Sequence, residues 1–284
     1  MARRRFRTVR RVVLLGLPAL LALLLVYVTR VEPRWIQVTH YDVPVDGLPA
    51  SLDGLRIVQV SDLHRGPRVP DSLIRKAVRV ANGESPDIVV LTGDFISRRP
   101  ENARPCAEIL AGLRPRLGAF AVLGNHDHWH GAQAVTDALS SQGIRVLNNE
   151  SRRVAPGLFM IGIDDTWAGH PDVRRAWSGV DARAGQVLLS HSPVAISLLS
   201  GRRCFAITGH THGGEVIVPF IPRSRLPGLR GFPYIGGWYR KDGVRMYVNR
   251  GIGLVNPLRI RFRCRPEISV FTLRSAGTAQ LHAR

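Results

Sequence analysis

Lysine and cysteine are both scarce in this chain of 284 residues. Lys76 and Lys241 are the only lysines, so the formal net charge of +19 comes almost wholly from arginine. The cysteines are odd in number and lack the paired spacing of metal-binding motifs, which argues against a zinc ribbon and against a complete disulfide framework. We expect them to be thiols of the core: Cys106, Cys204 and Cys264.

Two kinds of sequence pattern are also missing. The chain has no glycine-rich P-loop string, so phosphoryl transfer from ATP has no support, and it has no internal repeat or low-complexity segment. With 45% hydrophobic residues, it is long enough to bury a substantial core. We therefore expect one layered α/β domain. Its basic balance favours contact with anionic lipid, nucleic acid or phosphorylated substrates but does not decide the fold.

Residues 1–30 combine a basic segment with an apolar one. Six arginines between residues 3 and 11 precede an uncharged run from Val12 to Val28. As a helix this run would be roughly 26 Å long, just enough to span a bilayer. No cleavage site of the A-x-A kind follows it, so we expect an uncleaved, single-pass membrane anchor. Because only Arg30 and Arg34 lie just after the run, the arginine asymmetry predicts a cytoplasmic N-terminus and a catalytic domain outside the cell membrane.

The remaining chain divides into a linker with an edge strand over residues 31–54, one large domain over residues 55–274, and a tail over residues 275–284. Short runs rich in Val, Leu and Ile are typical of strands buried on both faces; they cover residues 55–60, 88–91 and 119–123. Amphipathic helical patterns separate and follow them, at residues 72–82, 106–113 and 132–141. Parallel strands joined by crossover helices follow from this alternation.

The second half of the domain has shorter strand candidates, which favour hairpins and a second sheet. They cover residues 145–148, 158–163, 187–189, 204–208 and 246–249. The stretch from Val216 to Tyr239 is rich in proline, glycine, arginine and aromatic residues. We expect it to be a long loop that could hold an amphiphilic substrate near a bilayer.

Five short polar motifs follow apolar runs and supply carboxylate, amide and imidazole groups. They are SDLH at residues 61–64, GD at 93–94, GNHD at 124–127, SH at 190–191 and GHTHGG at 209–214. Ligands of a parallel sheet bind beyond the carboxyl ends of its strands, so these motifs can share one site. Carboxylate, amide and imidazole without thiolate suit manganese, iron or zinc. This is the ligand list of a two-metal hydrolase.

The motifs differ in how much each one indicates alone. Taken alone, Asp62 and His64 could be an ordinary pair of surface residues, and His191 an ordinary core histidine. Gly-Asp is a common turn dipeptide. The GNHD motif is more specific, because it places an amide ligand, a proton donor and a carboxylate in consecutive positions. Two alternating histidines at a strand end, His210 and His212, are typical of a metal site.

In this order, from Asp62 to His212, the motifs resemble those of the calcineurin-like metallophosphoesterases, and the basic anchor resembles a membrane-anchored bacterial branch of that family. The resemblance implies a four-layer αββα sandwich. It implies two divalent ions, one held by Asp62, His64, Asp94 and His212, and the other by Asp94, Asn125, His191 and His210.

The resemblance also implies a mechanism. A hydroxide bridging the two ions would attack phosphorus directly in a phosphate mono- or diester. His126 would be the electrostatic stabiliser and general acid, with Asp127 holding its ring. We expect Arg65 to be an exposed arginine rather than a phosphate contact, and His128 and His130 to lie outside the metal ligands.

Several substrate classes remain open at this point. We expect a membrane-associated phosphoester. One alternative is a lipid diphosphate of the UDP-2,3-diacylglucosamine type, although such precursors are made on the cytoplasmic side of the membrane. A second alternative is a nuclease, since basic groups attract phosphates, but no dedicated nucleic-acid module is visible. A non-enzymatic scaffold is disfavoured because the ligand set is complete.

Overall fold

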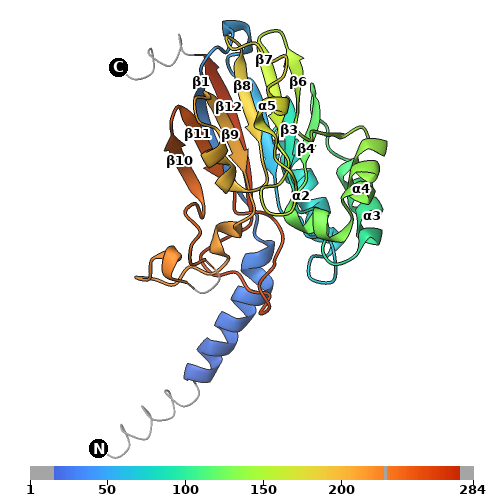
Figure 1. Cartoon of the computed structure of the whole chain (residues 1–284). Helices are drawn as coiled ribbons and strands as arrows, with labels where there is room; N and C mark the ends of the chain where they lie inside the picture. The colour runs from blue at the N-terminus through green and yellow to red at the C-terminus, as the bar shows by residue number, and fades with distance from the viewer. Residues whose placement is uncertain (1–15, 227–228, 276–284) are drawn as a thin grey trace, which may run out of the picture.

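Two six-stranded sheets packed face to face form the centre of the computed structural model, which describes residues 16–226 and 229–275 (Figure 1). The strand order is β1-β12-β2-β3-β4-β5 in the first sheet and β10-β11-β9-β8-β7-β6 in the second. The strands of the first sheet are β1 (Gln37–Val45), β2 (Arg56–Val60), β3 (Ile88–Thr92), β4 (Gly118–Val122), β5 (Arg145–Val146) and β12 (Glu267–Ser275). Those of the second are β6 (Glu150–Ala155), β7 (Leu158–Gly162), β8 (Gly185–Leu189), β9 (Cys204–Thr208), β10 (Gly237–Lys241) and β11 (Val244–Val248).

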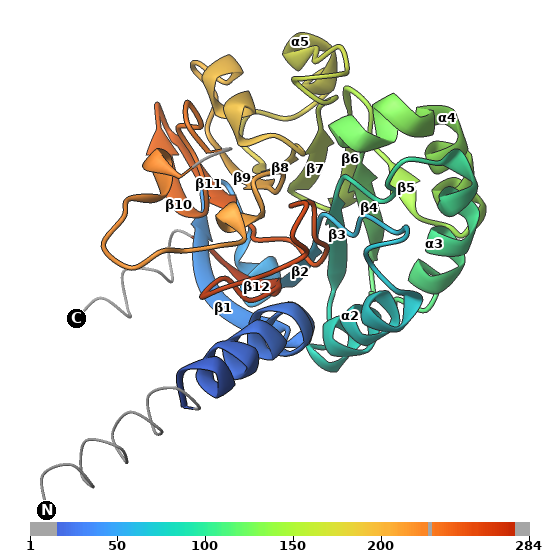
Figure 2. The same cartoon turned by 90° about the horizontal axis from the view of Figure 1, so that it is seen from below.

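The first sheet contains the predicted strand–helix–strand units. Strands β2, β3 and β4 pair in parallel, and β12 joins them as an antiparallel neighbour of β2. Three helices cover the outer face of this sheet: α2 (Asp71–Gly83), α3 (Ala103–Leu110) and α4 (Asn125–Ser141) (Figure 2). Ile88 to Leu91 are fully buried because β3 has helices on one side and the second sheet on the other.

The second sheet completes the four layers that the resemblance implied. Its inner face packs against the first sheet through side chains such as Met160, Val187 and Phe205. Its outer face is covered by short helices, α5 (Val173–Ala176) and the 3₁₀ helix η5 (Pro193–Leu198). The αββα sandwich is therefore confirmed.

The pairing in the second half differs from the predicted hairpins in two ways. Strands β7, β8, β9 and β11 pair in parallel, and hairpins form only the two sheet edges, β6–β7 and β10–β11. Strand β5 pairs with β4 and so extends the first sheet. Apolar runs buried on both faces are typical of parallel strands, so the composition of β8 and β9 fits this pairing.

Helix α4 also differs from the prediction. It begins at Asn125, seven residues before the expected start at residue 132, and a break at Gly131 (φ 143°) separates the two parts. The polar and aromatic residues of the first part lack an amphipathic pattern. That part is capped by Asp127, whose Oδ2 accepts the backbone N–H of Gly124 at 3.0 Å. The GNHD motif is thus a helix start rather than a loop.

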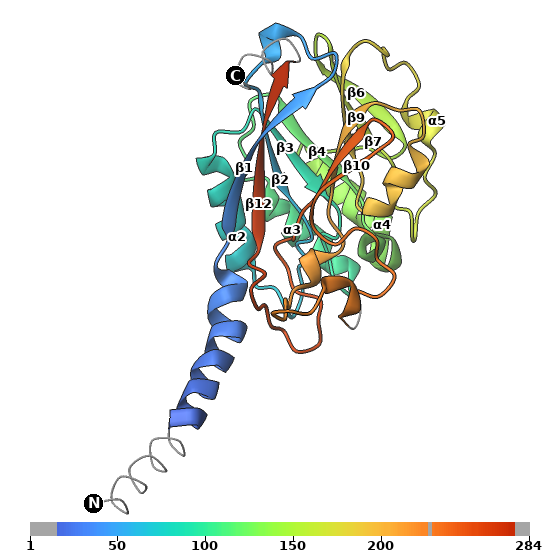
Figure 3. The ribbon, with the colours of Figure 1, turned by 90° about the vertical axis from the view of Figure 1, so that its left-hand side faces the viewer.

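An apolar helix over residues 16–34 leaves the domain at one end (Figures 1 and 3). It is long and apolar enough to cross a membrane, and residues 12–15 of the predicted span lie outside the described residues. Its carboxyl end is attached to the domain. The backbone N–H of Arg261 donates to the Val28 carbonyl at 3.0 Å, and buried Glu32 accepts the N–H of Cys264 at 2.6 Å.

Besides η5, the short helical turns of the described chain are η1 (Tyr27–Val31), η2 (Glu32–Arg34), η3 (Ala50–Leu52), η4 (Pro100–Asn102), η6 (His212–Gly214) and η7 (Arg223–Arg225). The predicted long loop ends at residue 236, directly before β10 begins at Gly237, and contains η7. The cysteines are buried and unpaired, as expected for core thiols.

Candidate metal centre

The five motifs meet at one end of the sandwich because each follows the carboxyl end of an inner strand. Strands β2, β3 and β4 of the first sheet lead into Asp62, Asp94 and Asn125. Strands β8 and β9 of the second sheet lead into His191 and His210. The facing sheets are joined just behind the motifs, where Gln59 Nε2 donates to the carbonyl of Thr208 at 2.9 Å. The end of the sandwich seen in Figure 2 therefore carries the candidate site.

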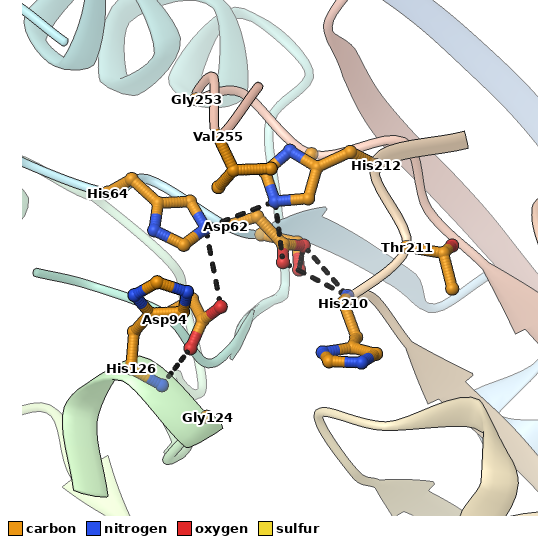
Figure 4. A network of polar contacts seen from close by, with 12 residues as sticks. Asp62, His64, Asp94, Gly124, His126, His210, Thr211, His212, Gly253 and Val255 are labelled. Atoms are coloured by element: carbon orange, nitrogen blue, oxygen red, sulfur yellow. Dashed lines mark hydrogen bonds and ion pairs between the residues drawn. The ribbon is translucent and has the colours of Figure 1, made fainter. Parts of the chain in front are cut away.

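A first group of donor atoms comes from Asp62, His64 and His212 (Figure 4). The Nε2 atoms of His64 and His212 lie 3.0 Å apart, and Nε2 of His212 lies 3.5 Å from Oδ1 of Asp62. All three residues are buried. Such donors, gathered from the ends of β2 and β9, could hold one metal ion.

A second group comes from Asn125, His191 and His210. Nε2 of His191 lies 3.1 Å from Oδ1 of Asn125 and 3.0 Å from Nδ1 of His210. His191 is fully buried at the end of β8, and Asn125 is buried at the start of α4. This group uses Nδ1 of one histidine and Nε2 of the other.

Asp94 joins the two groups. Its Oδ2 lies 3.3 Å from Nε2 of His64 in the first group and 3.3 Å from Nε2 of His191 in the second. Its Oδ1 accepts the backbone N–H of His126 at 2.9 Å, which fixes the carboxylate between them (Figure 4). The structure thus brings all seven predicted ligand side chains into one continuous cluster.

Hydrogen bonds from outside the cluster fix the rings of His191 and His64. Nδ1 of His191 donates to the Thr92 carbonyl at 2.8 Å, so its Nε2 can present a lone pair to the cluster. Nδ1 of His64 lies 3.1 Å from the Ser97 hydroxyl, and Nδ1 of His212 lies 3.4 Å from Oε1 of Glu215. Glu215 was not among the predicted site residues. Its position directly after the GHTHGG motif was the available signal.

The backbone of the cluster is strained. Five of the seven predicted ligands have positive φ values, between 49° and 74°: Asp62, His64, Asp94, His210 and His212. Left-handed backbone in residues other than glycine costs about 1–3 kcal/mol each and is retained where the surroundings impose it, most often at functional sites. Glycines allow the chain to approach closely here. A Cβ at Gly124 would overlap the Asp94 carboxylate, and one at Gly209 would overlap that of Asp62.

The charges of the cluster fit a bound cation. Burial lowers the pKa of His64 and His212 well below the usual value, and burial with the nearby His191 lowers the pKa of His210 to about 3. Burial also lowers the pKa of His191, but Asp94 outweighs it and raises that pKa to about 10. Three of the four imidazoles are therefore neutral donors, and Asp94 holds a proton on the fourth, His191. Imidazole and carboxylate donors together suit borderline divalent ions.

His126 faces the cluster, but Asp127 does not hold its ring. The Asp127 carboxylate is buried and accepts the backbone N–H groups of Phe95 at 2.9 Å, Ile96 at 3.2 Å and Gly124 at 3.0 Å. Within the described residues, Nδ1 of His126 has no hydrogen-bond partner. The implied orienting role of Asp127 is therefore wrong. This carboxylate instead fixes the loop after β3 to the start of α4.

Arg65, His128 and His130, the basic residues next to the motifs, are placed as follows. Arg65 is not an exposed arginine, because its Nε lies 2.9 Å from Asp71 and its Nη1 donates to Asn102 at 2.8 Å. His128 forms an ion pair with Asp164 at 2.7 Å, which links α4 to the loop after β7. The ring of His130 lies 5.7 Å from that of His126.

A cavity of about 410 Å³ opens onto the cluster. Aromatic side chains form its walls, since the Trp167 ring stacks on Phe232 at 5.5 Å and Trp129 lies 5.2 Å from the His126 ring. Both tryptophans are more than half exposed. Neither tryptophan was predicted to line the site, because nothing in their local sequence distinguishes them from ordinary loop tryptophans.

The family model for calcineurin-like phosphoesterases matches residues 55–225 of the chain. The chain is 30% identical to the uncharacterized metallophosphoesterase YkuE of Bacillus subtilis, over 88% of this chain and 90% of that protein. It is 33% identical to a transmembrane protein with metallophosphoesterase domain of Danio rerio, over 84% of this chain and 58% of that protein. It is 28% identical to the UDP-2,3-diacylglucosamine pyrophosphatase LpxG of Chlamydia trachomatis, over 86% of this chain and 91% of that protein.

Proposed function

The chain belongs to the calcineurin-like phosphoesterase family and is thus a metal-dependent hydrolase of phosphoric esters, and on that premise we propose that it uses two divalent ions to cleave a membrane-associated phosphoester. The position of Asp94, with one oxygen 3.3 Å from a histidine of each donor group, is the observation that carries the two-ion proposal. One ion would be held by Asp62, His64, Asp94 and His212. The other would be held by Asp94, Asn125, His191 and His210.

The bound ions would supply positive charge to the phosphate oxygens and a lower pKa for water. The protein side chains would do the rest. His126, at the cavity wall beside His64, would donate a proton to the leaving oxygen. The aromatic walls formed by Trp129, Trp167 and Phe232 would hold an apolar or aromatic leaving group and keep water from it.

The test uses the full chain, purified in detergent and reloaded separately with manganese, iron and zinc. Monoester, diester, nucleotide-sugar and lipid phosphoester substrates are compared side by side. We expect hydrolysis that requires metal and that disappears in Asp94→Asn. A reloaded chain that cleaves none of these classes would contradict the proposal.

A second candidate substrate is a lipid diphosphate of the UDP-2,3-diacylglucosamine type. It is supported by the similarity to LpxG, which extends over most of both chains. It requires the catalytic domain to face the cytoplasm, where nucleotide-activated lipid precursors are made. The location of the domain therefore distinguishes this candidate from the main proposal.

The apolar N-terminal helix and the transmembrane relative indicate a membrane protein, and we predict that its catalytic domain lies outside the cytoplasmic membrane. Six arginines precede the apolar run and only two follow it closely, which the insertion machinery reads as a cytoplasmic N-terminus. Reporter fusions after Arg284 should be active only outside the cytoplasm. Neutral residues in place of the six arginines should give mixed orientation. A wild-type reporter active only in the cytoplasm would overturn this topology and favour the lipid diphosphate.

Metal binding is expected to release a proton at neutral pH. The pKa of His191 is raised to about 10 in the metal-free centre, so its ring is protonated at neutral pH and must lose that proton to bind an ion. Apparent affinity should rise about tenfold per pH unit as the pH increases, until it approaches that pKa. Calorimetric titration in buffers of different protonation enthalpy measures the released proton. An affinity that does not change with pH would contradict the placement of His191 at the ion.

A further inference from the structure

Two loops carry apolar side chains into solvent at the end of the domain that holds the candidate metal centre. The first tip is formed by residues 219–222, in which Phe220 is fully exposed and Ile221 is 44% exposed. The second tip is formed by residues 257–259, in which Leu258 is 72% exposed. Large apolar side chains at such exposure normally need a partner surface when they lie together.

The two tips belong to one surface. The N–H of Phe262 donates to the Glu215 carbonyl at 3.0 Å, and the N–H of Ile217 donates to the Phe262 carbonyl at 2.8 Å, so the two loops run side by side at their bases. The second loop is also attached to the N-terminal helix through the bond from Arg261 to Val28. Figures 1 and 3 show both loops, in orange and red, at the end of the domain from which this helix leaves.

The charge of these loops is of one sign. The chain has 21 acidic residues, but residues 216–241 and 254–266 contain none. The exposed arginines within residues 216–236 and 254–266, the two loops that carry the tips, are Arg225, Arg230, Arg259 and Arg263. Arginines beside exposed apolar side chains are typical of surfaces that lie on anionic lipid, where the apolar groups enter the acyl region and the cations bind phosphates.

We propose that the tips at Phe220–Ile221 and Leu258 insert into the bilayer that the N-terminal helix crosses, with the neighbouring arginines on anionic headgroups. The partner is lipid rather than protein, because the helix that adjoins the second loop brings this same end of the domain to the membrane. The domain then lies against the bilayer instead of extending away from it.

The docked position determines how substrate reaches the cavity. Val255 and Asn256, directly before the second tip, line the cavity together with Pro257 of that tip. Leu229 and Phe232 line it from the first loop. The cavity therefore opens toward the lipid surface, and an amphiphilic phosphoester can enter without leaving the bilayer. This step rests on the proposed function, whereas the docking itself does not.

The test of docking uses variants of the full chain with one added surface cysteine each, in nanodiscs that contain phosphatidylglycerol. Phe220→Cys and Leu258→Cys carry an environment-sensitive fluorophore, and the buried native cysteines remain unlabelled. Leu198→Cys is the matched control, because Leu198 is 46% exposed on η5, on the outer face of the second sheet. We expect lipids with spin-labelled acyl chains to quench the emission at positions 220 and 258 and to leave position 198 unchanged.

Equal quenching at all three positions, or none at any, would overturn the proposal. Quenching at position 258 alone would also overturn it, because that residue adjoins the helix whether or not the domain docks. A second variant, Phe220→Ser with Ile221→Ser, should keep hydrolysis of a soluble phosphoester and lose that of one embedded in vesicles. If the wild-type chain cleaves neither substrate, the proposed function fails while the quenching result still decides the docking.

Discussion

Replacing Asp94 by asparagine is expected to remove metal from both halves of the centre. Oδ2 of Asp94 lies 3.3 Å from Nε2 of His64 and 3.3 Å from Nε2 of His191. The loss of the carboxylate charge should therefore weaken the binding of both ions. Loss of groups that only orient ligands typically costs about 10- to 100-fold in metal affinity. The loss of a shared ligand should exceed that range. Titration of the purified chain with manganese measures the change.

Two comparison variants make this prediction specific. Asn125→Ala removes a ligand of one group and should weaken one ion while leaving the other. Asp137→Asn removes a carboxylate from the exposed face of α4 and should change neither. If Asp94→Asn loses no more metal than Asn125→Ala, Asp94 does not bridge the two groups.

His126→Ala is expected to lower kcat by roughly 10² to 10⁴ on substrates with poor leaving groups, the range of lost general acid catalysis. The metal content of the variant should equal that of the wild-type chain, because His126 is not among the proposed ligands. Activated aryl esters need no proton on the leaving oxygen and should lose far less activity. If kcat falls as much on aryl esters as on alkyl esters, His126 acts through binding or charge rather than as a proton donor.

The pH dependence gives a second measure of the same role. Burial lowers the pKa of His126 in the free protein. A general acid must be protonated to act, so kcat/KM for an alkyl ester should fall as the pH rises through that pKa. This decrease of kcat/KM with rising pH should disappear in His126→Ala. It should persist in His130→Ala, which removes a nearby imidazole whose ring lies 5.7 Å away.

The inner strands and the metal-binding motifs could be predicted because they depend on local composition. Runs of Val, Leu and Ile such as Ile88 to Leu91 are typical of strands buried on both faces. Polar residues directly after such strands lie at the carboxyl edge of the sheet. The strand position of each motif thus determined which side chains would meet. The resemblance supplied the pairing of the sheets into one sandwich.

The features that were missed depend on contacts between segments far apart in the chain. The first part of α4 has no amphipathic pattern of its own, and its Asp127 is held by amides that follow β3. Strand β5 has only two residues, so its sheet is decided by its neighbour β4 rather than by its composition. Trp167 reaches the cavity because the loop after β7 folds over His210, at 5.1 Å between the rings. Local sequence cannot indicate any of these contacts.

The metal content of the wild-type chain tests the central claim most directly. The full chain is purified, stripped with a chelator, reloaded with manganese and analysed by elemental mass spectrometry after removal of free ions. Seven side chains with Asp94 shared between two groups predict two ions per chain. A carefully reloaded chain that holds one ion, or none, would contradict the two-metal centre.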